Sequence, residues 1–266
     1  MIGIFDSGVG GLTVVKEVFK HLSDYQIIYF GDTARLPYGT KGANFVKKYS
    51  DKITGWLLNK KAKIIIIACH TSSAWASDAL RKKYKDVPIF DMINSAINDV
   101  IKKTKNKKIG IIGTPGTVES GSWSKKLLEK DKSLTVYSVS CPLFVPLVEM
   151  GFTKGKVTEE ITKEYLKGLK SKKIDTLVLA CTHYPLLKKT IEKVMGKNVV
   201  IVDPAESVVR EIKLFLNNNI AIEKKIKKAK GHMFFFSDKP YNLEKISHLC
   251  FNQAIKNPKI KDPFNQ

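Results

Sequence analysis

The fold is decided by the stretch Lys63-Ile-Ile-Ile-Ile-Ala-Cys69-His-Thr-Ser-Ser73 and by its later counterpart, Thr176-Leu-Val-Leu-Ala-Cys181-Thr-His-Tyr-Pro185. Each is an apolar run that ends on a cysteine and is followed by hydroxyl-bearing residues. An apolar run without polar alternation is typical of a strand that is buried on both faces of a parallel sheet. In the first stretch, threonine and serine can cap a helix that we expect to begin near Ala74. The sequence therefore predicts the same strand, cysteine loop and helix twice.

A second matched pair of segments lies at the front of each half. Ile2-Gly-Ile-Phe5 leads into Asp6-Ser-Gly-Val-Gly-Gly11, and Lys108-Ile-Gly-Ile-Ile112 leads into Gly113-Thr-Pro-Gly-Thr117. Both segments predict a strand, a turn rich in glycine or hydroxyl residues, and a helix. The two halves are therefore related by an internal repeat.

The offsets of this repeat agree with one another. Ile109 minus Ile2 is 107 residues, and Cys181 minus Cys69 is 112 residues. The alternation of strands and helices predicts an α/β fold with two pseudo-symmetric, doubly wound parallel-sheet lobes. Ligand loops of such sheets lie at the carboxyl ends of the strands, so we expect the active site between the lobes.

The repeat also suggests where the lobes begin and end. We expect the first lobe to comprise residues 1-92 plus 205-266, and the second to comprise residues 93-204. A strand at Met233 to Phe236 and a final helix would then return the tail of the chain to the first lobe.

Composition narrows the class of protein. Of the 266 residues, 43% are hydrophobic and 27% charged, which is typical of a folded globular protein and excludes a disordered or fibrous chain. No apolar run approaches the roughly 20 residues of a membrane span, and the N-terminus lacks the basic region of a signal peptide. We therefore expect a cytoplasmic protein with no membrane partner.

The formal net charge of +21 raises the question of nucleic-acid binding, since clustered positive charge attracts phosphates. Arginine, whose planar fork suits bidentate recognition, occurs only as Arg35, Arg81 and Arg210. The lysines lie in short runs such as Lys60-Lys61, where a solvated helix face explains them. We therefore expect no nucleic-acid partner.

The cysteines carry the chemistry. Cys69, Cys141, Cys181 and Cys250 lack CxxC pairing and zinc-ligand spacing, so we expect neither disulfides nor a metal site. A free cysteine is usually a small buried hydrophobe, but Cys69 and Cys181 end equivalent strands of two related lobes. A thiol has an ordinary pKa of roughly 8.5, so one of the pair can act as a base and its twin as an acid. The pair therefore predicts a two-base mechanism in which a Cα proton leaves one face of a substrate and another proton arrives on the opposite face.

Neighbouring residues can support this chemistry. His183 lies two residues after Cys181, and Asp6 lies in the first glycine-rich turn, so each can relay a proton beside a thiol. Hydroxyl and backbone donors at strand ends and helix starts predict a small anionic ligand, although ordinary helix capping explains any one of them; they are Ser7, Gly8, Thr71, Ser72, Thr114, Thr117 and Thr182.

No cofactor is expected. The segment Gly8-Val-Gly-Gly11 fits neither the dinucleotide GxGxxG spacing nor the phosphate-loop motif. No lysine stands out as a Schiff-base site for pyridoxal phosphate.

Six motifs in order make the chain resemble the glutamate racemases over nearly its whole length. They are Phe5-Asp-Ser-Gly-Val-Gly-Gly-Leu12, Gly31-Asp-Thr-Ala-Arg-Leu-Pro-Tyr-Gly-Thr-Lys41, Ala68-Cys69 with Thr71 and Ala74, Ile112-Gly-Thr-Pro-Gly-Thr117, Pro146-Leu-Val-Glu149, and Ala180-Cys-Thr-His-Tyr-Pro-Leu-Leu187. The resemblance implies racemisation of glutamate by two cysteines without pyridoxal phosphate. It also implies a supply of D-glutamate for peptidoglycan, and hence a role in cell wall biogenesis and cell shape. Members of this family often form dimers, so a homodimer is the implied assembly.

The resemblance also assigns roles by position. Cys69, Cys181, Asp6 and His183 would be catalytic, with Glu149 an acidic partner near His183. The substrate-binding residues would be these five together with Ser7, Pro37, Tyr38, Gly39, His70, Thr71, Thr114, Thr117 and Thr182.

Three places depart from the family pattern, and one of them is Asn94-Ser95, where the family usually has Glu-Pro after the interlobe strand. His70 stands where the family usually has an asparagine that touches the substrate, and Trp123 stands where it usually has tyrosine. Histidine is bulkier and titratable, so substrate preference and pH dependence are open at this position. An aspartate racemase, a racemase of broader specificity, and a binding protein descended from a racemase are therefore the alternatives.

Overall fold

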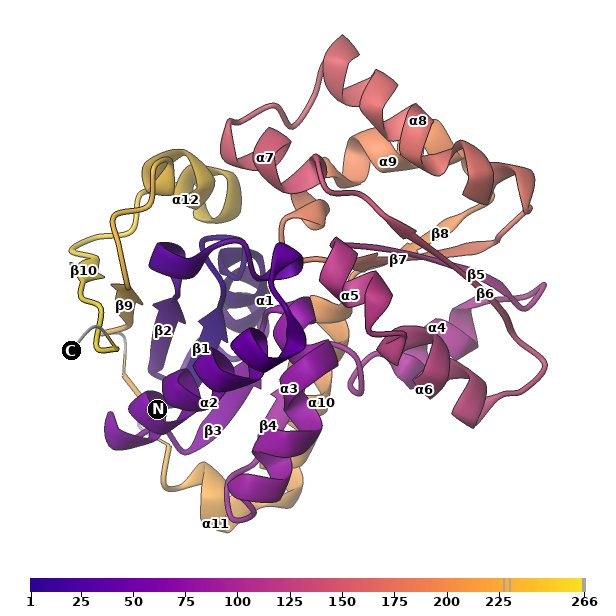
Figure 1. Cartoon of the computed structure of the whole chain (residues 1–266). Coiled ribbons are helices and arrows are strands. Elements are labelled where there is room, and N and C mark those ends of the chain that lie inside the picture. Colours follow the sequence, from indigo (N-terminus) through magenta and orange to yellow (C-terminus); the bar gives the residue numbers. More distant parts are fainter. Residues whose placement is uncertain (227, 230, 265–266) are drawn as a thin grey trace.

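The computed structural model describes residues 1–226, 228–229 and 231–264, and it contains two parallel sheets, each covered by helices (Figure 1). The first sheet has the strand order β10-β9-β2-β1-β3-β4 and the second has the order β6-β5-β7-β8. All strand pairs in these two sheets are parallel. The strands are β1 (Ile2–Asp6), β2 (Ile27–Gly31), β3 (Ile64–Ile67), β4 (Ile89–Asp91), β5 (Lys108–Gly113), β6 (Thr135–Ser140), β7 (Thr176–Ala180), β8 (Val200–Val202), β9 (Met233–Phe236) and β10 (Lys259–Ile260).

The helices alternate with the strands along most of the chain, as the sequence predicts. They are α1 (Leu12–His21), α2 (Ala43–Asn59), α3 (His70–Lys83), α4 (Ile97–Lys103), α5 (Pro115–Glu119), α6 (Ser122–Lys130), α7 (Phe144–Glu149), α8 (Lys156–Ser171), α9 (Lys188–Met195), α10 (Pro204–Asn218), α11 (Ile220–Glu223) and α12 (Leu243–Phe251). Short 3-10 turns are η1 (Thr33–Arg35), η2 (Tyr38–Thr40) and η3 (Tyr184–Leu187). Among the described residues, no helix is long and apolar enough to cross a membrane.

The predicted α/β fold with two related lobes is confirmed by the strand order. Strands β2-β1-β3-β4 of the first sheet and β6-β5-β7-β8 of the second follow the same order. In this correspondence β1 matches β5, and β3 matches β7. The two cysteine loops therefore leave equivalent central strands at the carboxyl ends of the two sheets.

Side-chain alternation explains how helices cover both faces of each sheet. In β3, Ile64 and Ile66 join a core cluster that includes α1 and α10, whereas Ile65 and Ile67 join a cluster that includes α2 and α3. Successive strand residues point to opposite faces, so an uninterrupted apolar strand requires helices on both. The second sheet is covered in the same way, by α4 and α6 on one face and by α7, α8 and α9 on the other.

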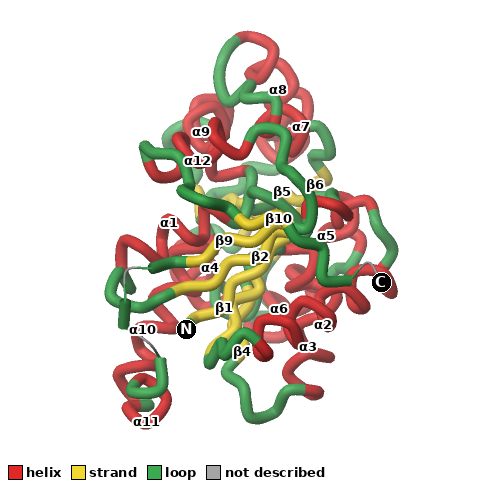
Figure 2. The backbone as a smooth tube through the Cα atoms, turned by 90° about the vertical axis from the view of Figure 1, so that its left-hand side faces the viewer, coloured by secondary structure: helices red, strands yellow, loops and turns green. Residues whose placement is uncertain are grey.

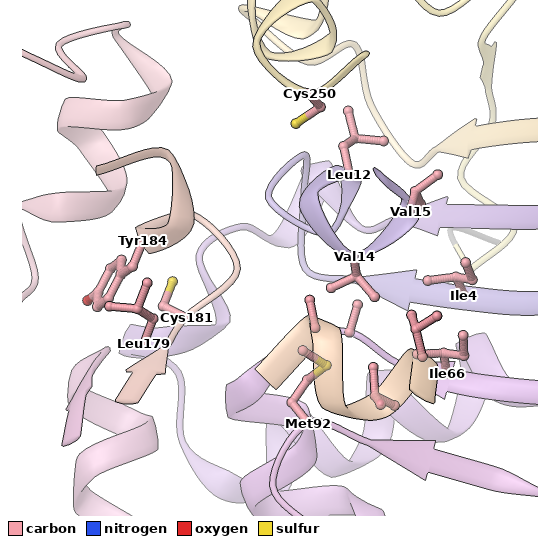
Figure 3. Packing of buried hydrophobic residues seen from close by; sticks show 14 of the residues in the cluster. Ile4, Leu12, Val14, Val15, Ile66, Met92, Leu179, Cys181, Tyr184 and Cys250 are labelled. Atoms are coloured by element: carbon pink, nitrogen blue, oxygen red, sulfur yellow. The ribbon is translucent and has the colours of Figure 1, made fainter. Parts of the chain in front are cut away.

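The two lobes share a continuous hydrophobic core. Leu12 and Val14 of α1 belong to the same buried cluster as Leu179, Cys181 and Tyr184 of the second lobe (Figure 3). Burial of apolar surface between the lobes stabilises their relative placement and so the geometry of any site between them.

The final strands lie at the edge of the first sheet, where β9 pairs with β2 and β10 pairs with β9 (Figure 2). Helix α10 packs against α1 and leads back from the second sheet to the first. On this basis we propose lobe limits of residues 1–92 plus 205–266 and residues 93–204.

One prediction about the first cysteine loop is wrong. Helix α3 begins at His70 rather than near Ala74, so Thr71, Ser72 and Ser73 lie in its first turn instead of capping it. Cys69 is the N-cap residue, and its Sγ accepts a hydrogen bond from the backbone N–H of Ser72 at 3.4 Å. The helix begins earlier than expected because the thiol of Cys69, rather than a threonine or serine hydroxyl, supplies the capping acceptor.

Candidate active site

Cys69 and Cys181 line one cavity between the carboxyl ends of the two sheets, with about 310 Å³ of empty space. Both side chains are largely buried, at 5% and 6% exposure, so each can act in a site shielded from bulk water. The lining includes ten of the fourteen residues expected from the sequence, namely Ser7, Pro37, Gly39, Cys69, His70, Thr71, Thr114, Cys181, Thr182 and His183.

The other four expected residues lie behind this lining. Asp6, Tyr38 and Thr117 are buried and hydrogen-bond to residues at or near the cavity. Glu149 contacts His183 and borders a second, wider cavity that shares Leu36, Pro37 and Val145 with the first.

The thiol of Cys69 lies at the junction of β3 and α3. Its Sγ is 3.8 Å from the Oγ of Ser7, to which it donates, and it accepts from the backbone N–H of Ser72. Burial, followed by the negative charge of Asp6, raises the pKa of the Cys69 thiol to about 11. Cys69 therefore holds its proton near neutral pH.

The environment of Cys181 is different. Its Sγ is 3.9 Å from Nδ1 of His183, and Nε2 of the same ring is 3.0 Å from Oε1 of Glu149. Burial lowers the pKa of His183, but the contacts with Cys181 and Glu149 outweigh it and raise that pKa to about 10. His183 is therefore an imidazolium near neutral pH, and its positive charge lies beside the Sγ of Cys181.

Asp6 connects the two lobes at the base of the site. It ends β1 of the first sheet, yet its Oδ1 accepts a hydrogen bond of 3.2 Å from Thr182 of the second lobe. Its Oδ2 accepts from the backbone N–H of Gly8 at 3.0 Å. Burial raises the pKa of Asp6, while the charge of His183 and these hydrogen bonds oppose the rise. The carboxyl group thus interacts electrostatically with Cys69 on one side and with His183 on the other.

Three threonine hydroxyls form a cluster at one side of the cavity. The Oγ1 atoms of Thr71, Thr114 and Thr117 lie 2.9 to 3.0 Å from one another. Thr71 belongs to the first lobe, whereas Thr114 and Thr117 follow β5 of the second. Hydroxyl hydrogens can rotate toward an anion, so this cluster can donate to a carboxylate.

The loop 31–41 reaches the cavity through its backbone more than through its aromatic ring. The hydroxyl of Tyr38 donates to Oδ2 of Asp32 at 2.5 Å, and its ring is fully buried rather than among the lining groups. Gly39 lies so close to Thr114 that an added Cβ would be 2.4 Å from the threonine Cβ. This glycine therefore permits the close approach of the two lobes.

His70 lines the cavity and is almost fully buried. Its Nδ1 has no hydrogen-bond partner among the described residues, and its ring stacks against Trp123 with centroids 6.2 Å apart. Burial lowers the pKa of His70 to about 3, so the ring is neutral at physiological pH. His70 therefore places a polar but uncharged group in the site.

Sequence reasoning missed three lining residues, Leu36, Val145 and Ala180. Val145 lies outside the quoted motifs, and only its position at the cavity identifies it. A signal was available for Leu36 and Ala180, which directly precede Pro37 and Cys181 in the quoted motifs. The two remaining cysteines lie outside the site: Cys141 and Cys250 are free and buried.

Comparison with known proteins places this geometry among racemases. A family model described as Asp/Glu/Hydantoin racemase matches residues 7–212. The glutamate racemase of Aquifex pyrophilus is 43% identical over 95% of this chain and 94% of its own length.

Two solved structures share the fold over nearly their whole length. Glutamate racemase from Francisella tularensis, in complex with D-glutamate, is 34% identical with a TM-score of 0.89, covering 97% of this chain and 96% of that one. The glutamate racemase isoform RacE1 from Bacillus anthracis is 32% identical with a TM-score of 0.91, covering 100% and 98%.

Proposed function

We propose that this chain, which belongs to the Asp/Glu/Hydantoin racemase family, interconverts L- and D-glutamate by proton transfer at Cα between Cys69 and Cys181. Because the chain belongs to this family, it is an amino-acid racemase, which is a kind of isomerase. The observation that carries the two-thiol mechanism is that both cysteines line a single buried cavity from equivalent strand ends of two related lobes.

The electrostatics favour a definite resting state. Cys181 beside the imidazolium of His183 is the base, and Cys69, whose pKa is raised to about 11, is the acid. The thiolate of Cys181 takes the Cα proton, and the electron pair of the broken C–H bond is delocalised into the substrate carboxylate. The thiol of Cys69 then delivers its proton to the opposite face of Cα, which leaves Cys69 as the thiolate. The reverse reaction begins from this second state, so the pair serves both enantiomers.

The remaining residues hold the substrate. We propose that the hydroxyls of Thr71, Thr114 and Thr117, with the backbone at the start of α3, donate to the substrate carboxylates. Thr182 and Ser7 lie beside Asp6 and Cys69 and orient the groups that exchange protons. No step requires pyridoxal phosphate, because the two thiols move the proton.

Glutamate is proposed as the substrate because relatives more than 30% identical over nearly the whole chain are glutamate racemases. The D-glutamate produced would serve peptidoglycan synthesis in the cytoplasm and so support cell wall biogenesis and cell shape. We also propose a homodimer, for which analytical ultracentrifugation gives the test: a single species of about twice 29.9 kDa is expected.

The proposed function is tested by circular dichroism with L-glutamate, D-glutamate and L-aspartate in separate reactions without added cofactor. We expect both glutamate enantiomers to lose optical activity. Cys69→Ser and Cys181→Ser should each lower kcat by about 10²-fold or more, because each removes a proton donor or acceptor.

Other outcomes identify the alternatives. Turnover of aspartate alone would indicate an aspartate racemase with the same two-thiol mechanism. Turnover of both amino acids would indicate a racemase of broader specificity. A protein that racemises neither amino acid but binds DNA in a salt-dependent way would be a racemase-derived binding protein.

A further inference from the structure

A segment near the C-terminus contacts both lobes beside a cavity that adjoins Leu36 and Glu149. This bridging segment, residues 237–242, is held to the first lobe by reciprocal hydrogen bonds between Thr33 and Asp238. The Thr33 hydroxyl donates to the Asp238 carbonyl at 2.5 Å and accepts from the Asp238 N–H at 2.9 Å. The Oγ of Ser237 also accepts from the backbone N–H of Ala34 at 2.8 Å. The bridging segment is therefore fixed to the same loop that carries Tyr38 and Gly39.

The other end of the bridging segment reaches the second lobe. Asn242, which immediately precedes α12, donates from Nδ2 to the backbone carbonyl of Glu149. Lys245, within α12, donates to the carbonyl of Met150 at 3.4 Å. Helix α12 accordingly lies near the end of α7 (Figure 1).

The carbonyl that Asn242 contacts has a particular need for a donor. Glu149 is the last residue of α7, and the final carbonyls of a helix have no partner within the helix. The amide of Asn242 supplies that partner from the first lobe. A cavity with about 630 Å³ of empty space adjoins both residues. Buried side chains of α7, such as Phe144 and Val148, anchor the helix in the core, and the Asn242 hydrogen bond holds its end on the side of this cavity.

Glu149 links the Asn242 contact to the thiol of Cys181 through His183. Its carboxylate is 3.0 Å from Nε2 of His183, and Nδ1 of that ring is 3.9 Å from the Sγ of Cys181. The main chain of Glu149 is thus fixed by Asn242 while its side chain fixes His183. A continuous series of polar contacts runs from the C-terminal segment to the site.

We propose that Asn242 is a positioning residue for proton transfer at Cys181, acting through Glu149 and His183. This role rests on the proposed function, in which Cys181 is a reacting group. By joining the first-lobe loop to the end of α7, the bridging segment brings the Glu149–His183 pair into place only when the lobes are correctly apposed.

Other ionisable groups also face this pair and stay constant in the test. Asp6 at the end of β1 interacts with His183, while Tyr184 and Cys141 interact with Cys181 from the second lobe. A shift that follows a change at residue 242 but not at Lys245 is therefore assigned to the position of Glu149.

The test measures the alkylation rate of Cys181 by iodoacetamide against pH in a Cys69→Ser background, with peptide mass spectrometry to identify the modified thiol. In Asn242→Ala the midpoint of the plot of alkylation rate against pH should move to higher pH by about one unit, because a displaced Glu149 carboxylate stabilises the His183 imidazolium less. At a pH below the midpoint, the thiolate fraction of Cys181 should then be about tenfold lower. Asn242→Leu, of similar size but without a donor, should give the same shift, and Glu149→Gln a larger one. Lys245→Ala is the matched control, since it removes the other contact between α12 and the end of α7, and its midpoint should not move.

Kinetics with both cysteines present provide a second readout. In Asn242→Ala we expect kcat to fall roughly tenfold while KM changes little, because the residue does not touch the substrate. The two enantiomers have equal free energy, so kcat/KM must stay equal in both directions for every variant.

Two results would overturn the positioning role while leaving the racemase assignment intact. One is an unchanged midpoint in both Asn242 variants, and the other is an equal shift in Lys245→Ala, which would indicate general loosening of the lobes. If Cys181→Ser retained full racemisation, the proposed function itself would fall, and this inference with it.

Discussion

At the scale of single residues, His70 has the most unusual environment in the site. It is a polar ring that lines the cavity and has a buried nitrogen without a hydrogen-bond partner among the described residues. An unpartnered buried polar atom is unfavourable unless a ligand satisfies it. The neutral ring can accept or donate a single hydrogen bond to the substrate without adding charge.

His70→Asn should make the stability of the protein less sensitive to acid. The folded-state pKa of about 3 lies below the ordinary value of 6.5, so between these values the unfolded chain binds a proton that the folded protein does not. The free energy of unfolding therefore falls as the pH is lowered through that range. From pH 7 to pH 5 the asparagine variant should lose about 2 kcal/mol less than the parent, measured by urea unfolding. Parallel losses in the two proteins would show that His70 is protonated in the folded state.

At the scale of secondary structure, the approach of η2 to α5 closes the site. Gly39 in η2 comes from the first lobe, and Thr114 caps α5 in the second, where its Oγ1 accepts from the N–H of Thr117 at 3.4 Å. Gly39 does not adopt a positive φ, so its importance lies in the space that it leaves rather than in its backbone conformation.

Gly39→Ala should therefore push the two lobes apart. The new Cβ would meet Thr114 at 2.4 Å, a contact that requires the backbone to shift. We expect a loss of about 1–3 kcal/mol in the free energy of unfolding and a fall in kcat/KM of roughly 10²-fold. Urea unfolding and circular dichroism kinetics measure the two effects.

Gly168→Ala is the control for this substitution. Gly168 lies in α8 with open space where a Cβ would be added. Alanine favours helix more than glycine does, so the variant should gain about 0.5–1 kcal/mol with unchanged activity. Full activity in Gly39→Ala would mean that the lobes are not held at this distance during turnover.

At the scale of the whole molecule, the charge balance opposes folding. The chain has 46 lysines and arginines against 25 aspartates and glutamates. Many of the ion pairs in the described part of the chain, such as Lys167–Glu164, are exposed and contribute little. Repulsion among the remaining cations is therefore the larger electrostatic effect.

Salt should stabilise the protein for this reason. Raising sodium chloride from about 0.02 M to about 0.3 M shortens the screening length and should raise the free energy of unfolding on the order of 1 kcal/mol. Potassium chloride at equal ionic strength should act equally, because screening does not depend on the identity of the ion. A decrease in stability with salt, measured by urea unfolding, would mean that the ion pairs outweigh the repulsion.

The sequence by itself determined the local elements, the internal repeat and the family. Apolar strands such as Ile64–Ile67 and Thr176–Ala180 are recognisable because burial on both faces leaves a continuous run, and the two copies align at Cys69 and Cys181. The predicted resemblance to glutamate racemases is confirmed by relatives that match nearly the whole chain.

Only the tertiary structure decided how these parts meet. It joined Thr182 to Asp6 and Asn242 to Glu149 across the lobes. The physical reason is that sequence periodicity records which face of an element is buried. Contacts between residues about 90 or more positions apart depend instead on the orientation of one lobe against the other, which the packing of the shared core determines.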